Sequence, residues 1–587
     1  MPQLTQDLSV LVGAAFLEAG VEANYGVVQR SDRPDLAQFQ CNGALAAAKA
    51  AKANPRAIAE NVTARLKEDP RFAKVEIAGP GFINLTLTDQ ALTDHLRTFA
   101  DDRRCGVPLR SPGQVVIIDF VGVNIAKAMH VGHLRSTIIG DCLQRLFRFA
   151  GDTVYSDVHF GDWGLQMGQL ITEVERELPQ LPYFDPAYSG PYPETSPVTT
   201  DDLEVLYPRA SAACKADADR LNQARQATAD LQTGRPGYRA LWRHFQNVSI
   251  ETVKRELASL GVHPDWWKGE SDADPLVEPM VNDLQMRGVA VESEGALVVP
   301  IDQEGDKKEM PPLIVRKSDG GALYETTDLA TIIDRVREVD PDQILYVVDQ
   351  RQSDHFERVF RASRKAALNG KAHLEHVAFG TVNGTDGKPY KTRSGDSVKL
   401  FDLIAQAQDE ARQRLDEQGI AGSYSSEERD AIANAVGLAA IKFADLTNYR
   451  TTNYIFDLVR FTRFEGETGP YLQYQAVRIK SLLRRAEEQG FAVAPVMVTS
   501  ASERELALSL SRLPDVLAQA ESRRAPNVLC DFAFELAQGF SRFYGEHHIM
   551  SEPVPEARGA RLALCRMVLD QLTLVLGLLG ITIPERM

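Results

Sequence analysis

The stretch QVVIIDFVGVNIAKAMHVGHLRST, residues 114–137, decides the fold of this chain. It begins with a β-branched run, QVVIIDF (114–120), which is too uniformly apolar for a strand with one solvated face, so we expect a strand buried in a parallel sheet. A loop follows, then a predicted helix from about His130 to Ala150 with Gly151 as its stop, and a second strand in DTVYSDVH (152–159). Strand, helix and strand in this order form a βαβ unit, the start of a doubly wound sheet.

A second unit of the same kind lies further along the chain. Its parts are the strand ILYVVDQ (344–350), the helix SDHFERVFRASRKAAL (353–368) and the strand HVAFGTV (376–382). Between the two units we expect an insertion over about residues 172–310. It opens with the proline-rich PQLPYFDPAYSGPYPETSP (179–197), which cannot be helical, and continues through a helical region to WWKGE (266–270) and the strand-like ALVVPI (296–301).

The two ends of the chain predict different architectures. Residues 1–112 mix helical stretches with the strand-like KVEIAGPGFINLTL (74–87), which predicts a small N-terminal α/β domain. From Ser425, where S-x-x-E offers a capping box, the chain is almost wholly helical. We therefore expect three domains: a small α/β domain over 1–112, a doubly wound (Rossmann-type) parallel-sheet α/β domain with the insertion over 113–420, and an all-α helical bundle over 421–587.

Composition excludes several classes of protein. With 587 residues, 44% of them hydrophobic and 25% charged, the chain is long enough for several cores and is neither fibrous nor disordered. The N-terminus lacks a basic signal-peptide region, and the apolar VLDQLTLVLGLLGITI (568–583) is interrupted by Asp570 and Gln571, so we expect a buried helix there, no membrane span and a cytoplasmic, monomeric protein. A net charge of −16 opposes nonspecific attraction to nucleic acid, so an RNA partner would need local basic surface. Six scattered cysteines, without a CxxC or Cys/His cluster, predict neither a zinc site nor disulfides.

The loop after the first strand is the expected ligand site, because doubly wound sheets bind ligands at the carboxyl ends of their strands. His130 and His133 flank Gly132 at the start of a helix, which would place both imidazoles beside free backbone N–H groups and the positive end of the helix dipole, a setting for phosphate. Gly132 lets a base or ribose approach the backbone, and Lys127 adds a mobile positive charge. No GxGxxG or GxxxxGK[ST] occurs in this loop, which argues against dinucleotide oxidoreductases and P-loop NTPases. Two histidines at a helix start can also simply cap or pack, and the motif alone leaves that alternative open.

Seven stretches of the sequence together resemble the motifs of a known family. These are NIAKAMHVGHLRSTIIGD (124–141), HFGDWGLQMG (159–168), KSDGGALYETTDLA (317–330), YVVDQRQSDHF (346–356), DGKPYKTRSGD (386–396), FEGETGPYLQYQAVR (464–478) and the final ERM (585–587). Together, and in this order over the whole chain, they resemble the class I aminoacyl-tRNA synthetases, and among them the arginyl enzymes. The resemblance implies an arginine–tRNA ligase, which adenylates L-arginine with ATP and then transfers the arginyl group to the 3′-terminal ribose of tRNA(Arg). Mg²⁺ is expected with the ATP rather than in a protein cage.

The resemblance also implies which residues handle ATP, and the sequence departs from the family at some of them. Val123 stands before Asn124 where the family commonly has proline, and Ala128 precedes Met129. The KMSK motif is absent, and DGKPYKTRSGD occupies its place. In arginyl enzymes without KMSK, a lysine upstream of HxGH is thought to compensate, and Lys127 has that position. The residues implied for ATP binding and catalysis are Lys127, His130, Gly132, His133 and Lys391.

An arginine pocket needs carboxylates, because guanidinium is a planar fork of donors. The resemblance implies that Tyr324 and Asp328, four apart and on one face if YETTD is helical, grip the side chain with Gln352. Asp119 stands where the family often has glutamate. Taken alone, Asp328 is equally well explained as a charge at a helix start, and Tyr324 and Gln352 as packing. A site with buried polar groups rejects a substrate that leaves them unpaired by roughly 10⁴- to 10⁵-fold, so we expect no proofreading site. The residues implied for arginine are Asp119, Asn124, His130, Tyr324, Asp328 and Gln352.

The resemblance places tRNA on both ends of the chain. It puts Phe82 and Asn84 of GFINL at a D-loop base, and it puts Tyr471, Tyr474, Arg478 and Met587 near the anticodon, where aromatic rings stack on bases and arginines meet phosphates. It also implies that tRNA must be present before arginine is activated. Without the family, the tyrosines and Phe82 would be assigned to the core and the charges to a solvated face. The basic residues of this region are Arg450, Arg460, Arg463, Arg478, Lys480, Arg484 and Arg485.

Other functions stay open at this point. A class I synthetase for cysteine or glutamate would share the HxGH sheet, but missing zinc ligands oppose the first and an acidic pocket opposes the second. A nonenzymatic RNA-binding paralogue is disfavoured by the intact loop. A small HxGH nucleotidyltransferase is disfavoured by the helical C-terminal module.

Overall fold

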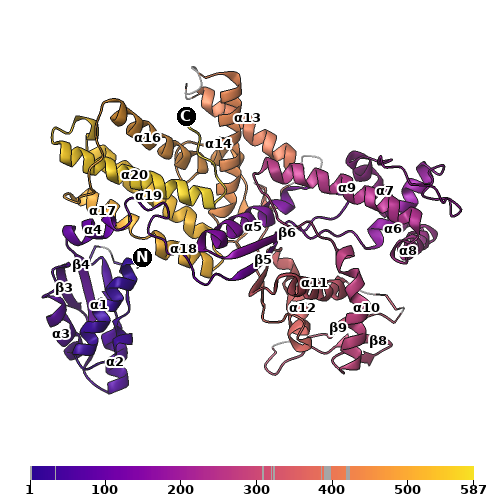
Figure 1. The fold of residues 1–587 in the computed structure, drawn as a ribbon, viewed down its shortest axis with the longest axis horizontal. Helices are drawn as coiled ribbons and strands as arrows, with labels where there is room; N and C mark the ends of the chain where they lie inside the picture. Colours follow the sequence, from indigo (N-terminus) through magenta and orange to yellow (C-terminus); the bar gives the residue numbers. More distant parts are fainter. Residues whose placement is uncertain are drawn as a thin grey trace. The chain divides into compact units, whose positions relative to one another are not determined.

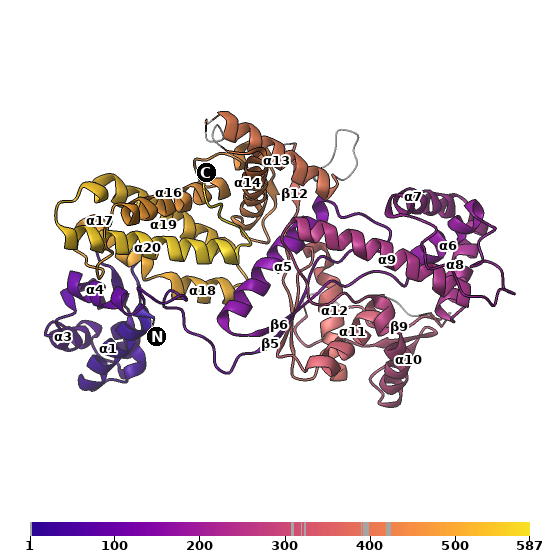
Figure 2. The same ribbon diagram turned by 45° about the horizontal axis from the view of Figure 1, so that its top comes forward.

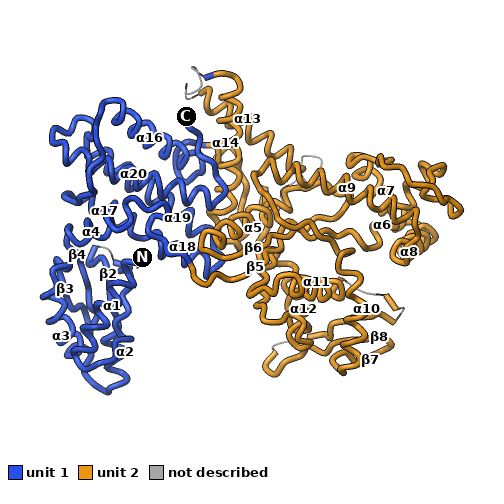
Figure 3. The backbone as a smooth tube through the Cα atoms, in the orientation of Figure 1, with its two compact units in different colours: residues 1–109, 419–424, 463–587 blue, residues 110–418, 425–462 orange. Residues whose placement is uncertain are grey.

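The computed structural model (Figure 1) describes residues 3–33, 35–306, 310–318, 320–321, 324–384, 386–388, 390, 398–417, 419 and 424–587. The chain divides into two compact units, coloured separately in Figure 3. The first unit holds residues 1–109, 419–424 and 463–587, and the second holds residues 110–418 and 425–462. Helix α14 (Ser426–Leu446), which the sequence groups with the C-terminal helices, lies in the second unit.

The N-terminal part of the first unit is the expected small α/β domain. Its antiparallel sheet has the order β1-β2-β4-β3, and β4 alternates, with Ile83, Leu85 and Leu87 in the core and Phe82 and Asn84 on the other face. The strands are β1 (Val28–Arg30), β2 (Phe39–Cys41), β3 (Phe72–Ala78) and β4 (Phe82–Leu87). The helices are α1 (Leu4–Glu18), α2 (Gly43–Ala51), α3 (Pro55–Leu66) and α4 (Asp89–Arg97).

The C-terminal part of the first unit is the expected helical bundle. Its helices are α16 (Gly469–Glu488), α17 (Ala501–Leu510), α18 (Leu513–Ser522), α19 (Asn527–Glu546) and α20 (Pro555–Leu578). The apolar run near the C-terminus forms the end of α20, whose Leu572, Val575 and Leu576 are fully buried, as expected. Among the described helices, none is both long and apolar enough to cross a membrane.

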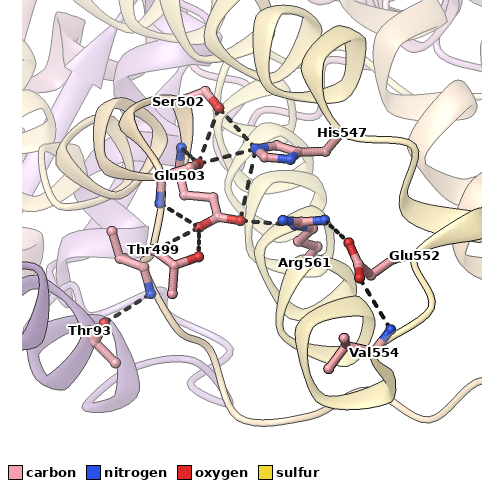
Figure 4. A network of polar contacts seen from close by, with 10 residues as sticks. Thr93, Thr499, Ser502, Glu503, His547, Glu552, Val554 and Arg561 are labelled. Atoms are coloured by element: carbon pink, nitrogen blue, oxygen red, sulfur yellow. Dashed lines mark hydrogen bonds and ion pairs between the residues drawn. The ribbon is translucent and has the colours of Figure 1, made fainter.

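A polar network joins the two parts of the first unit (Figure 4). The Glu503 carboxylate, in the first turn of α17, accepts hydrogen bonds from the Thr499 amide (2.7 Å) and hydroxyl (2.8 Å) and from Arg561 Nε of α20 (2.9 Å). The amide of Val498, one residue before Thr499, donates to Thr93 Oγ1 of α4 (3.0 Å). Since Glu503 is 2% exposed, this carboxylate holds the start of α17 in place between α4 and α20.

The second unit contains the doubly wound sheet. Four parallel strands have the order β11-β10-β5-β6: β5 (Val115–Asp119), β6 (Thr153–Asp157), β10 (Gln343–Tyr346) and β11 (His373–His376). The predicted strand at 376–382 is wrong in position, because β11 ends at His376. In β11, Leu374 and His376 pair with Ile344 and Tyr346 of β10. The more apolar residues after His376, which the prediction included, form the connection beyond the sheet.

Helices cover this sheet and build the insertion. Helices α5 (Val131–Ala150), α11 (Tyr324–Val339) and α12 (Ser353–Ala366) directly precede or follow its strands, whereas α13 (Leu400–Glu417) and α14 contact α5. The insertion contains α6 (Leu165–Glu177), α7 (Thr200–Ala216), α8 (Ala218–Gln232), α9 (Pro236–Ser259), α10 (Glu270–Met286) and a small antiparallel sheet of β7 (Val291–Ser293), β8 (Ala296–Val299) and β9 (Leu313–Arg316). Figures 1 and 2 show α6, α7, α8 and α9 gathered into one helical group, and the proline-rich stretch 179–197 is free of helix, as predicted.

A buried ion pair helps to hold α14 in place. Arg135 of α5 and Asp445 of α14 lie 2.8 Å apart, with 1% and 0% of their side chains exposed, and the Arg135 guanidinium lies over the Tyr454 ring. Removing either partner would leave a buried charge unpaired, so the pair holds α14 against the helix that follows β5. The remaining short elements are β12 (Val382–Asn383), β13 (Tyr454–Ile455), α15 (Leu458–Phe461) and the single turns 23–26, 350–352 and 549–551.

Candidate active site

The candidate site lies where the order of the sheet reverses. Strands β5 and β10 are neighbours, β6 lies beyond β5, and β11 lies beyond β10. The connections that leave β5 and β10 therefore run to opposite sides and leave a crevice between them at the carboxyl ends of the strands. The loop after β5 carries Asn124, Lys127 and His130, and the turn after β10 carries Gln352.

Both histidines of the motif cap helix α5. The His130 side chain accepts a hydrogen bond from the Gly132 amide at Nδ1 (2.9 Å), and His133 Nδ1 accepts one from the His130 amide (3.1 Å). This is a capping box made by two imidazoles, whose ring centroids lie 4.1 Å apart. Because each Nδ1 accepts an N–H, the proton of each neutral ring lies on Nε2, which is left as a donor.

The backbone of the first turn is not available in the way the sequence suggested. The amide of Val131 donates to Val398 O (3.0 Å), that of Gly132 to His130 Nδ1, and that of His133 to His130 O (2.8 Å). The expectation of free N–H groups for phosphate is therefore wrong at these three positions. The cause is the capping itself and the pairing of residues 398–400 with 129–131.

Both histidines have lowered pKa values, which favours the neutral rings. Burial, reinforced by the nearby positive charge of Lys127, lowers the pKa of His130. Burial, with His130 and Lys127 adding to it, lowers the pKa of His133 to about 3. The two rings therefore offer neutral Nε2–H donors, and Lys127 is the cationic member of this group.

Two glycines of the HFGDWG segment make room for predicted site residues. A Cβ on Gly161 would lie 2.1 Å from Asn124 Oδ1, and a Cβ on Gly164 would lie 3.2 Å from the Tyr324 hydroxyl. Gly161 also forms a backbone bridge with Asn124. The structure thus brings Asn124 and Tyr324 against the same short segment.

A group of acidic residues surrounds Tyr324. Tyr324 and Asp328 begin helix α11 and are one turn apart on it, as the sequence predicted for a helical YETTD. Burial, with the charges of Asp162 and Asp328 adding to it, raises the pKa of Glu270 to about 8. Partial desolvation of the Tyr324 hydroxyl, with the charge of Glu270 adding to it, in turn raises the pKa of Tyr324, a residue that is 64% exposed overall. These carboxylates and the tyrosine therefore share one region, at the start of α11 and the start of α10.

Asp328 has a partner within the chain. His355 Nε2 lies 2.7 Å from Asp328 Oδ2. Burial lowers the pKa of His355, but the hydrogen bond and charge of Asp328, helped by Glu325, raise it above its ordinary value on balance. Asp328, in the first turns of α11, thus lies within hydrogen-bonding distance of a histidine of α12.

Asp119, at the end of β5, is also engaged. Arg335 Nη2 of α11 lies 2.6 Å from Asp119 Oδ2 and 2.6 Å from Asp157 Oδ2, and the Arg335 side chain is fully buried. An internal guanidinium therefore occupies one oxygen of the carboxylate that the sequence assigned to substrate arginine. Sequence reasoning missed Arg335, because it lies 216 residues from Asp119.

Two other expectations bear on ATP and metals. Lys391 lies outside the described residues. Within the described part of the chain, no group of three or more His, Cys, Asp or Glu residues is placed to hold a metal ion.

The residues expected to meet tRNA lie in the first unit, apart from Arg450 and Arg460. Phe82 is half-buried, and Asn84 Oδ1 accepts from Gln40 Nε2 (3.1 Å) on the sheet face opposite the core. On α16, Tyr471 packs edge-on against Phe534, Tyr474 is exposed, and the Arg478 guanidinium lies 4.4 Å over the Tyr544 ring centroid. Since Phe82 is half-buried and lies on the face of β4 opposite the core, it is not a core residue of its sheet. Met587 is partly exposed.

Comparison with known proteins gives this geometry a family. The description "Arginyl tRNA synthetase N terminal domain" matches residues 3–87, "tRNA synthetases class I (R), catalytic domain" matches 98–458, and "DALR anticodon binding domain" matches 472–587. The arginine–tRNA ligase of Maricaulis maris is 54% identical over 588 residues, and that of Alkaliphilus oremlandii is 45% identical over 590, each covering 100% of both chains. The arginyl-tRNA synthetases of Plasmodium falciparum and Thermus thermophilus share the fold, with TM-scores of 0.82 and 0.78 at 24% and 22% identity and full coverage of both chains.

The parallel sheet, its histidine-capped helix and the match over 98–458 define a class I aminoacyl-tRNA synthetase. Among these enzymes, the chain belongs to the arginyl-tRNA synthetase family, the arginine–tRNA ligases. The alternatives of another class I specificity, a nonenzymatic paralogue or a small nucleotidyltransferase are set aside by these full-length matches.

Proposed function

We propose that the chain joins L-arginine to tRNA(Arg) at the crevice between β5 and β10, with ATP at the start of α5 and arginine at the acidic region beside Tyr324. The observation that carries this arrangement is the placement of two groups of side chains. Lys127 and the two imidazoles belong to the start of α5, whereas Glu270 and Asp328 belong to the starts of α10 and α11, where Ser271 donates two hydrogen bonds to Asp162.

In the first step, the arginine carboxylate attacks the α-phosphorus of ATP and displaces pyrophosphate. Such a reaction needs positioning and charge stabilisation more than a protein nucleophile. His130 and His133 donate from Nε2 to phosphate oxygens, and Lys127 and Lys391 supply positive charge. Because both rings are already fixed by their Nδ1 hydrogen bonds, they need no reorganisation as charge develops. Mg²⁺ enters with ATP as the counterion of its phosphates, and no residue of the chain is assigned to hold it.

Recognition of arginine rests on paired carboxylates. We assign Asp328, with Tyr324 beside it, to the guanidinium, and we add Glu270, which the sequence did not single out. A bound guanidinium favours the charged form of a carboxylate, so arginine would bring Glu270 into its ionised state. We also assign Asp119 to this pocket, with one of its oxygens committed to Arg335. Asn124 and His130 face the α-amino and carboxylate groups, and Gln352 assists.

In the second step, the arginyl group passes to the 3′-terminal ribose of tRNA. We propose that residues 1–112 contact tRNA through Phe82 and Asn84, that 113–420 carry the chemistry, and that 421–587 meet the anticodon through Tyr471, Tyr474, Arg478 and Met587. The exposed Tyr474 supports the anticodon assignment, and the position of Phe82 and Asn84 on the face of β4 opposite the core supports the N-terminal one, although Asn84 is only 8% exposed. A monomeric state and a cytoplasmic location complete the proposal, and sedimentation of the purified protein tests the former.

Pyrophosphate exchange tests the site directly. With tRNA(Arg) present, arginine alone among the amino acids should support exchange, and His133→Ala should slow it about 10²-fold or more while arginine binding and the fold are kept. Exchange without tRNA should be weak. Unchanged exchange in His133→Ala would remove the ATP assignment, and arginine binding unaffected by Asp328→Asn would remove the arginine assignment.

A further inference from the structure

Helix α7 of the insertion turns one face toward the ATP site. Tyr207 and Glu204 are three residues apart on this helix and so lie on the same side of it. Both are partly buried, whereas Val205, on another side, is 65% exposed. Nothing in the HxGH or arginine motifs points to this helix.

Tyr207 contacts the lysine that stands in for the missing KMSK lysine. The Lys127 ammonium lies 4.9 Å from the centroid of the Tyr207 ring, within the range of a cation–π interaction. Lys127 has four methylene groups and no fixed geometry of its own, so a ring that holds its ammonium limits where the charge can go. Tyr207 also contributes, after burial and Glu270, to the raised pKa of Tyr324.

Glu204 contacts a second lysine beside the same motif. Its carboxylate lies 2.6 Å from Lys399 Nζ. Lys399 is joined to the HxGH segment by its backbone, because residue 399 bridges to His130 and Leu400 donates to Met129 O (3.0 Å). Glu204 and Lys399 both line a cavity of about 620 Å³ between α7, α9 and residues 398–401, so the pair is not part of a packed core.

We propose that Tyr207 and Glu204 are positioning residues of the ATP site, through which helix α7 fixes Lys127 and the segment paired with His130. This inference rests on the proposed role of Lys127 in phosphate binding. Tyr207 acts through Lys127 by holding its ammonium over the ring. Glu204 acts through Lys399 by anchoring the strand-like segment 398–400 against residues 129–131. Neither residue is proposed to touch substrate.

A double-mutant cycle in the full-length protein tests Tyr207. Pyrophosphate exchange, with arginine and tRNA present, is measured for Tyr207→Leu, Tyr207→Phe, Lys127→Ala and the Lys127→Ala/Tyr207→Leu double variant. Losing a cation–π contact should lower kcat/KM for ATP about 3- to 30-fold in Tyr207→Leu, while Tyr207→Phe keeps the ring and stays within about twofold. The double variant should be no worse than Lys127→Ala alone. Val205→Ala, the matched control on α7, should equal the wild type.

The outcomes separate this inference from the proposed function. If Lys127→Ala leaves exchange unchanged, the phosphate role of Lys127 fails and this inference falls with it. If Lys127→Ala impairs exchange but Tyr207→Leu does not, or if the two losses simply multiply, only the inference about Tyr207 is overturned. Equal damage from Tyr207→Phe and Tyr207→Leu would also overturn it, because the ring would then not be the holding group.

Variants of Glu204 provide a second test, which does not depend on whether the Tyr207 variants fold. Glu204→Gln should lower kcat/KM for ATP about two- to fivefold, the range of a partly exposed ion pair, and the loss should vanish in a Lys399→Met background. An equal loss in both backgrounds would show that Glu204 does not act through Lys399.

Discussion

Replacing Gly132 by alanine separates the helix-forming role of the HxGH segment from its chemical role. A Cβ at this position would lie 2.6 Å from Cε1 and 2.8 Å from Nδ1 of His130, closer than such atoms can approach. The obstructed group is the end of a side chain, so the ring can swing away. It then loses the hydrogen bond from the Gly132 amide that fixes it.

The expected magnitudes decide what the variant should show. Alanine is better than glycine inside a helix by about 1 kcal/mol, and losing a cap costs about 0.5 to 2 kcal/mol, so the free energy of unfolding should change little. A displaced His130 no longer donates to phosphate, and loss of one preorganised donor costs about 10²- to 10³-fold in kcat. Gly132→Ala should therefore fold like the wild type and exchange pyrophosphate about 10²-fold more slowly.

Gly545→Ala is the matched control. Gly545 lies in helix α19, and a Cβ there meets no atom within 4 Å. This variant should keep full activity and gain up to about 1 kcal/mol of stability. Thermal unfolding and exchange kinetics of both variants provide the comparison. Exchange by Gly132→Ala within threefold of the wild type would refute the idea that His130 must stay where its cap holds it.

Three further outcomes are expected. Because the pKa of Glu270 is raised to about 8, this residue is mostly protonated at pH 7 and must release its proton to pair with arginine. The KM for arginine should therefore fall as pH rises from 6.5 to 8.5, by up to about tenfold per pH unit, and Glu270→Gln should abolish this pH dependence. A pH dependence that survives in Glu270→Gln would contradict the assignment. Asn84→Ala and Phe82→Leu should raise KM for tRNA about fivefold or more without changing KM for ATP, which aminoacylation kinetics would reveal, and an equal change in both constants would point to damaged folding instead. Glu503→Gln should lower the free energy of unfolding, measured by urea denaturation, by about 1.5 to 3 kcal/mol, because the variant loses charge-assisted hydrogen bonds. Burial raises the pKa of Glu503, but the hydrogen bonds from Arg561 and Thr499 outweigh it and lower the pKa on balance. The stabilisation that Glu503 gives the wild type should therefore be lost as pH falls below about 4.5.

Local signals predicted the parts of the fold that local physics decides. Helix α5 begins after His130 and ends before Gly151, whose φ of 108° suits glycine, and α14 begins at the capping box of Ser425. The doubly wound sheet followed from the apolar run before the motif. The position of β11 could not be predicted in the same way, because its sequence HLEH is polar and its pairing with β10 depends on the assembled sheet.

The candidate site could be predicted only where its residues lie within motifs. Tyr324 and Asp328 were assigned through the family resemblance, and the structure places them one turn apart on α11. Glu270, which we propose for the pocket, was not singled out, because only the fold brings the start of α10 beside the start of α11. Arg335 and Tyr207 were missed for the same reason. Their partners Asp119 and Lys127 lie far away in sequence, and no periodicity connects them.

The imidazole capping box has a consequence for proton inventory. Each ring uses Nδ1 to complete the helix start, so its tautomer is chosen when the helix forms, before any nucleotide arrives. With the pKa of His133 at about 3, that ring carries the same single proton across the physiological range. Nucleotide binding should therefore not protonate His133. The measured enthalpy of nucleotide binding should then contain no contribution from buffer ionisation that is due to this residue.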